Sequence, residues 1–252
     1  MTADVENIAS PKTKVAPSFQ DGTLSNSFIT IKIGSDRKDY QVHKDLICFH
    51  FPYFDAAFNG KFKEGEEGVL ELAATEESIF WLFLDWLYFG KLPERILCSD
   101  ENDDGEAEEG EDDEYDPSPA YELHVFADRY NVPELRRALM EKIRSAWKAQ
   151  ERCLPSNEEI TWLFNALPES STLCKLVVDL FAYRFDPAAD EKRDIKARSQ
   201  LPWNVLLKLV LRTAEVRATY AGNMDFDGNC GYHEHVTAEE REACESGDKE
   251  QD

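Results

Sequence analysis

The pattern of apolar and polar positions near the N-terminal end of the chain predicts a small sheet. Apolar side chains occupy every second position from Ile29 to Ile33, which is typical of a strand with one buried face. A Gly-Ser-Asp turn at 34–36 leads to a second strand around Tyr40–Val42. A third strand follows at Val69–Leu72, so we expect three short strands.

Patterns with a helical period occupy most of the remaining chain. They predict two short helices, Lys44–His50 and Pro52–Asn59, the second with proline in the favoured first-turn position. The helix that runs to Phe89 is apolar on nearly every face, which predicts that it is buried in the middle of the fold. Further helices are predicted at 119–130, 133–147, 156–167, 171–185 and 202–219.

Two of these helices carry additional signals. Ser156 and Glu159 have the spacing of a capping box, in which each side chain accepts a hydrogen bond from the other residue's backbone N–H. The helix at 202–219 shows an apolar stripe that supports its assignment. The stripe consists of Trp203, Leu206, Val210 and Ala214.

Segments of biased composition divide the chain. We expect a flexible N-terminal segment at 1–24 and a disordered acidic insertion at 98–118. Of the 17 residues at 100–116, 12 are acidic and none is basic, so this block repels itself and has little apolar surface to bury. It lacks the ligand spacing of a calcium loop and is better suited to docking a basic partner. A helical extension is expected at 148–220 and an acidic tail at 221–252.

The overall charge restricts the classes of partner. The chain has 252 residues, with 28 basic and 51 acidic side chains and a formal net charge of -23. Such a surface repels phosphate backbones and anionic lipids, so we expect neither nucleic acid nor membrane as a partner. No apolar run is long enough to span a bilayer, and the first residues lack the apolar core of a signal peptide. We therefore expect an intracellular, reducing location, in which the six cysteines are thiols or metal ligands rather than disulfides.

Several short motifs occur in order along the first half of the chain. They are VHK at 42–44, PYFDAAF at 52–58, FKEG at 62–65, LFLDWLYFGKL at 82–92 and VFADRYNVPELRRAL at 125–139. This series resembles a BTB/POZ domain over 25–147, and the chain is similar to the short BTB proteins of filamentous fungi. The resemblance implies an α/β (α+β) fold with a small mixed sheet flanked by a helical bundle, followed here by an all-helical C-terminal extension.

The resemblance also implies a function. BTB/POZ domains are protein–protein interaction modules, so we expect an adaptor or scaffold with protein partners and no small-molecule substrate. Many members self-associate, and others are substrate adaptors of cullin-type ubiquitin ligases or transcriptional cofactors. By analogy, a cullin contact is expected just after the helix that ends near Gly90, where Leu92 and Glu94 form a hydrophobic-x-Glu pattern.

One departure from the family concerns its charged dimer pocket. In repressor-type members an aspartate precedes the first strand, and a basic residue lies two positions before the histidine of the VHK motif. Phe28 and Gln41 occupy the matching positions in this chain. These residues cannot form the charged pocket that lines the dimer interface of those members.

Titratable side chains gather around the VHK motif and raise the question of catalysis. They are His43, Asp45, Cys48, His50 and Asp55. A nucleophile needs a base within hydrogen-bond reach, yet on a helix that begins near Lys44 the ring of His50 is turned away from Cys48. Cys48 also lies among apolar residues, where a thiol behaves as a small core side chain. We expect no catalytic residue here; a thiol-dependent enzyme is the alternative, which a low pKa of the Cys48 thiol would favour.

The tail concentrates a second set of potential metal ligands. Cys230, His233, His235 and Cys244 form a C-x2-H-x-H-x8-C arrangement, and thiolate and imidazole are the ligands that zinc prefers. Four protein ligands would close a structural site with no open catalytic position. The spacing fits no standard zinc finger, so a partly ordered tail without metal is the other interpretation.

Overall fold

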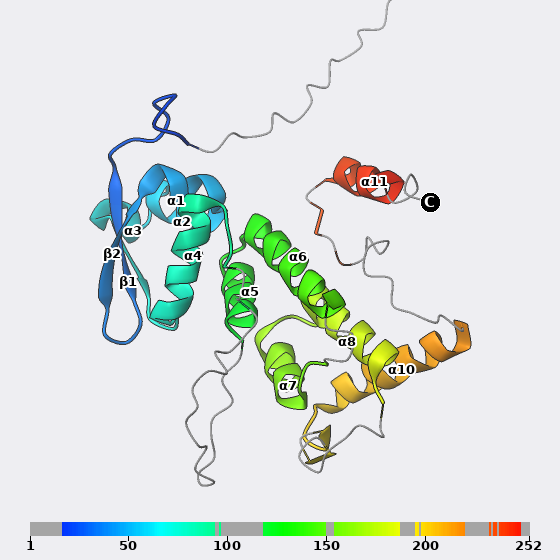
Figure 1. The fold of residues 1–252 in the computed structure, drawn as a ribbon. Coiled ribbons are helices and arrows are strands. Elements are labelled where there is room, and N and C mark those ends of the chain that lie inside the picture. The colour runs from blue at the N-terminus through cyan, green and yellow to red at the C-terminus, as the bar shows by residue number, and fades with distance from the viewer. Residues whose placement is uncertain are drawn as a thin grey trace, which may run out of the picture. The chain divides into compact units, whose positions relative to one another are not determined.

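The computed structural model describes residues 17–93, 96, 118–149, 154–186, 195–196, 198–219, 232, 234–235 and 237–247 (Figure 1). These residues belong to two compact units, which divide between Glu76 and Glu77. The predicted acidic insertion and parts of both terminal segments lie outside the described residues. Within the described part of the chain, no helix is both long and apolar enough to cross a membrane.

A mixed three-stranded sheet forms the centre of the first unit. Strands β1 (Phe28–Ile33), β2 (Lys38–His43) and β3 (Val69–Leu72) are arranged in the order β2-β1-β3. β1 runs antiparallel to β2 and parallel to β3. The alternation seen in the sequence buries one face, which carries Ile29, Ile31, Ile33, Val42, Leu70 and Leu72. The small mixed sheet predicted from the sequence is therefore confirmed.

Three helices complete the described part of this unit, residues 17–76. α1 (Lys44–His50) and α2 (Pro52–Asn59) have the predicted bounds, and Pro52 lies in the first turn of α2. α3 (Lys63–Glu67) forms where the sequence suggested only a turn-like link. It is a single turn that ends at Gly68 in the left-handed conformation, and a helix this short is below what hydrophobic periodicity can detect.

The second unit is entirely helical in the residues described. Its helices are α4 (Glu77–Phe89), α5 (Pro119–Arg129), α6 (Pro133–Ala149), α7 (Asn157–Ala166), α8 (Thr172–Arg184), α10 (Trp203–Thr219) and α11 (Ala238–Gly247). α5 and α6 pack together through the apolar positions that marked them in the sequence. The predicted capping box begins α7: Ser156 Oγ accepts from the Glu159 N–H at 3.1 Å, and Glu159 Oε2 accepts from the Ser156 N–H at 2.6 Å.

α8 and α10 pack side by side (Figure 1). α8 is buried along almost its whole length, including the carboxylate of Asp179, which accepts a charge-assisted hydrogen bond from Arg212 on α10. α10 buries Val205, Leu209 and Val216. The stripe that identified this helix in the sequence is therefore not its buried face: Trp203, Val210 and Ala214 are exposed.

Candidate interaction site

The exposed side of α4 is the clearest apolar surface within the part that resembles a BTB/POZ domain. The helix buries Ile79, Phe80, Phe83, Trp86 and Leu87. Trp81, Tyr88 and Phe89 lie on its other side and are exposed, Trp81 to 53% and Phe89 to 71%. The prediction that α4 is buried all round was therefore wrong. An all-apolar helix pattern shows that burial is favourable, but it does not tell which side the neighbouring elements cover.

The end of this helix is set by Gly90. Gly90 adopts a left-handed conformation (φ 64°), and its N–H donates to the Trp86 carbonyl over 2.8 Å. This conformation suits glycine and turns the chain out of the helix. Leu92 follows two residues later and is half-buried, whereas Glu94 lies outside the described residues. Leu92 thus follows closely in sequence on Tyr88 and Phe89, the exposed aromatic residues of the last turn of α4.

A second aromatic group lies on the polar face of the sheet in the first unit. Phe28 and His43 are register partners across β1 and β2, and their ring centroids are 4.3 Å apart. Phe19 contacts His43 edge-on at 5.7 Å. Gln41 is exposed. At the positions where repressor-type relatives are expected to carry a charged pocket, this chain has a partly exposed aromatic contact and a neutral amide.

The segment that precedes β1 forms hydrogen bonds with the start of α1. The Ser25 N–H donates to Asp45 Oδ2 over 2.7 Å, and the Lys44 N–H donates to the Ser27 carbonyl over 2.9 Å. The side chain of Ser25, together with its backbone N–H, lowers the pKa of the Asp45 carboxyl because hydrogen bonds to the carboxylate stabilise the charged form. Asp45 therefore has a structural role here.

The thiol of Cys48 has a raised pKa. Burial raises its pKa to about 11, and the nearby carboxylate of Asp55 adds to the shift. The ring of His50 contacts Phe49 and Phe51. A nucleophilic cysteine requires a lowered pKa, so the shift has the wrong direction for catalysis. Cys48 is half-buried, and this shift supports its interpretation as a structural rather than a nucleophilic thiol.

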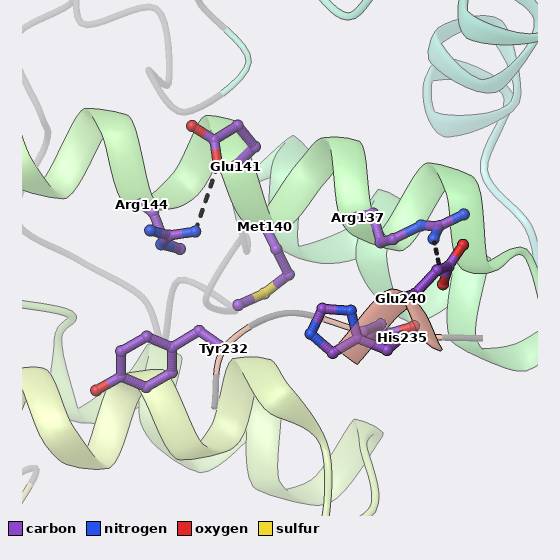
Figure 2. A pocket seen from close by; sticks show the side chains of 8 residues that line it. Arg137, Met140, Glu141, Arg144, Tyr232, His235 and Glu240 are labelled. Atoms are coloured by element: carbon purple, nitrogen blue, oxygen red, sulfur yellow. Dashed lines mark hydrogen bonds and ion pairs between the residues drawn. The ribbon is translucent and has the colours of Figure 1, made fainter. Parts of the chain in front are cut away.

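Within the second unit, the C-terminal tail contacts α6 at a site that sequence analysis did not find. Glu234 accepts from Arg136 Nε at 2.8 and 2.9 Å, and Glu240 pairs with Arg137 at 3.6 Å. A cavity of about 320 Å³ lies between α6 and this part of the tail (Figure 2). Arg137 and Met140 line it from α6, and His235 lines it from the tail. Because its charged side chains are of both signs, this cavity does not select an anion or a cation.

The structure describes only half of the predicted zinc ligands. His235 and Cys244 are half-buried, while Cys230 and His233 lie outside the described residues. Among the described residues, no three His, Cys, Asp or Glu side chains come together to hold a metal ion. The zinc site therefore stays a prediction. Metal analysis of the purified protein and of Cys230→Ser decides between zinc and a metal-free tail: one zinc per chain that the substitution removes establishes the site, and a content near zero excludes it.

Comparison with known families identifies the first part of the chain. A family model of the BTB/POZ domain matches residues 19–105. The match includes the sheet, α1–α4, Gly90 and Leu92. The chain therefore contains a BTB/POZ domain, which is a protein–protein interaction module and belongs to a non-enzymatic domain family. The domain boundary predicted at 147 and the limits of the helical extension stay predictions.

Proposed function

We propose that this protein is an adaptor or scaffold, and that its BTB/POZ domain holds a protein partner on the exposed side of α4. The observation that carries the proposal is the group of Trp81, Tyr88 and Phe89 on one helix. Large aromatic side chains dominate the binding energy of protein interfaces, and contiguous exposed apolar surface marks interaction sites. Asp85 lies between Trp81 and Tyr88 in the sequence and is exposed on the same side of α4. Its carboxylate favours a partner that offers a matching polar group over one that does not.

A pull-down with the full-length protein tests this proposal. We expect the double substitution Trp81→Ser and Phe89→Ser to reduce partner recovery by at least about tenfold, because two large contacts are lost at an interface. Phe62→Ser is the matched control, since Phe62 is also an exposed aromatic residue but lies outside α4. Thermal unfolding of each variant excludes loss of the fold. Equal recovery of partners by the α4 variant and the wild type would contradict the proposal.

A cullin-type ubiquitin ligase is the more specific form of this function. It is supported by the position of Leu92 directly after α4 and by the hydrophobic-x-Glu pattern that Leu92 and Glu94 form. In that case a cullin co-purifies with the wild type, and Leu92→Ala or Glu94→Lys removes it. A transcriptional cofactor is the other form. Recovery of transcription factors without a cullin, unaffected by substitutions at Leu92 and Glu94, would favour it.

A further inference from the structure

We propose that the outward face of α10 is a self-association surface, on which the α10 helices of two copies pack antiparallel around a two-fold axis. This surface lies outside residues 19–105 and is separate from the proposed partner site on α4. The inference begins with the two sides of the helix. The side that packs on α8 carries Val205, Leu209 and Val216, all buried. The other side is also apolar, although it is exposed.

The exposed side has the spacing of a helix-packing seam. Trp203, Leu207, Val210 and Ala214 follow one another at intervals of four, three and four residues, as the core positions of a coiled coil do. Trp203 is 73% exposed and Val210 is 64% exposed. Leu206 and Leu211 flank the seam, half-buried and exposed respectively. Six apolar residues thus lie along a helix of about 25 Å with no described element of the same chain packed over the most exposed of them.

The four seam residues are self-complementary in an antiparallel pair. The two-fold axis lies between the two helices, level with the midpoint between Lys208 and Leu209. It places Trp203 against Ala214 of the second copy. It also places Leu207 against Val210. The largest side chain then meets the smallest, and Leu207 meets a side chain of similar size. This is the relationship that an isologous interface requires, because each contact occurs twice.

The distribution of charge favours a second copy at this face. The positions beside the paired part of the seam, Asn204, Leu206, Leu211 and Thr213, are uncharged, so an antiparallel pair opposes no like charges there. Arg217, which continues the seam, is exposed in the last turn and lies beyond the paired residues. Lys208 pairs with Glu169 at 3.2 Å, and Arg212 pairs with Asp179 and Glu215 within its own chain. α10 carries three basic and one acidic side chain, in a chain of net charge -23. It therefore offers a place where two copies of this acidic protein meet without strong repulsion.

Sedimentation velocity of the full-length protein at increasing concentration tests the proposal. One helix pair is a small interface, so we expect a reversible dimer with a Kd on the order of micromolar. Val210→Glu places a charge at an apolar contact on both sides of the axis and is expected to weaken the dimer by at least about tenfold. Ile195→Glu is the matched control, because Ile195 is similarly exposed but lies outside α10. A wild type that remains monomeric up to about 100 μM would overturn the proposal.

A charge-pair experiment tests the antiparallel arrangement itself. Leu207→Lys and Val210→Glu are each expected to weaken self-association. When the two variants are mixed, the antiparallel heterodimer pairs Lys at 207 with Glu at 210 and leaves the other Leu207–Val210 contact intact. Recovery of dimer in the mixture supports the arrangement. No recovery overturns it, and dimerisation unchanged by Val210→Glu would place self-association elsewhere in the chain. Because both variants retain Trp81 and Phe89, loss of the dimer is distinguishable from loss of partner binding at α4.

Discussion

The hydroxyl of Tyr232 donates to Asp179 Oδ2 over 2.5 Å, and both residues are almost completely buried. Asp179 lies in the middle of α8, whereas Tyr232 belongs to the tail, 53 residues further along the chain. Arg212 of α10 donates to the other oxygen of the same carboxylate. The buried carboxylate of Asp179 thus connects α8, α10 and the tail. Each of its oxygens accepts a hydrogen bond, one from Arg212 and the other from Tyr232. Burial and the Asp179 carboxylate raise the pKa of Tyr232, so its hydroxyl remains a donor.

Removal of this hydroxyl is expected to destabilise the second unit. Tyr232→Phe keeps the ring in place but leaves one oxygen of Asp179 without this donor, which we expect to cost about 1–3 kcal/mol in the free energy of unfolding. Urea unfolding monitored by tryptophan fluorescence measures the change. Tyr53→Phe is the control, because Tyr53 is exposed and lies in the first unit, so its change should stay within about 0.5 kcal/mol. A Tyr232→Phe variant as stable as the control would contradict this role.

The contact between Glu234 and Arg136 is expected to hold the tail on α6. Both side chains are mostly buried, and the Arg136 guanidinium also donates to the Ala127 carbonyl over 3.3 Å. Glu234→Gln removes the negative charge but keeps the size of the side chain. We expect faster proteolysis within 232–247 and a loss of about 1–3 kcal/mol, because a mostly buried guanidinium loses its nearer carboxylate and keeps only that of Asp128, at 3.8 Å. Glu239→Gln is the control, since Glu239 is exposed on α11. Unchanged protection of the tail from proteolysis would argue against this anchor.

The sequence predicted the elements of this fold far better than its surfaces. Among the described residues, periodicity located all three strands and most of the helices, because burial of one face imposes a period of two or 3.6 residues. The same reasoning failed for α4 and α10, where apolar residues occur on both the buried and the exposed sides. It also could not find the contact between Tyr232 and Asp179. Such a contact depends on packing between segments distant in sequence, and neither residue has a distinctive local pattern.

The thiols of Cys48 and Cys174 are expected to react slowly. Burial raises the pKa of Cys48 to about 11 and that of Cys174 to about 12. At about pH 8 only about one thiolate in a thousand forms at Cys48, and thiolate is the reactive species. Alkylation with iodoacetamide, followed by peptide mass spectrometry, should therefore label both residues at least about tenfold more slowly than in urea-unfolded protein. Rapid labelling of Cys48 in the folded protein would instead favour the thiol-dependent enzyme.

His124 is expected to make the second unit sensitive to acid. The side chain is fully buried on α5, and neither ring nitrogen has a hydrogen-bond partner among the described residues. Burial lowers its pKa from 6.5 to about 3, and the nearby Arg136 cation contributes to the shift. The unfolded chain therefore binds a proton below about pH 6.5 that the folded chain does not bind, so stability falls as the pH falls from about 6.5 towards 3.

The size of this effect can be measured against a variant that cannot titrate. Between about pH 7 and about pH 5, His124 should account for a loss of about 2 kcal/mol in the free energy of unfolding. His124→Phe replaces the imidazole with an apolar ring, and the loss over this pH range should shrink by that amount even if the variant is less stable at both values. His50→Gln serves as the control, because His50 is only half-buried. If wild type and His124→Phe lose the same stability between the two pH values, His124 is protonated in the folded protein and its ring must have a polar partner at low pH.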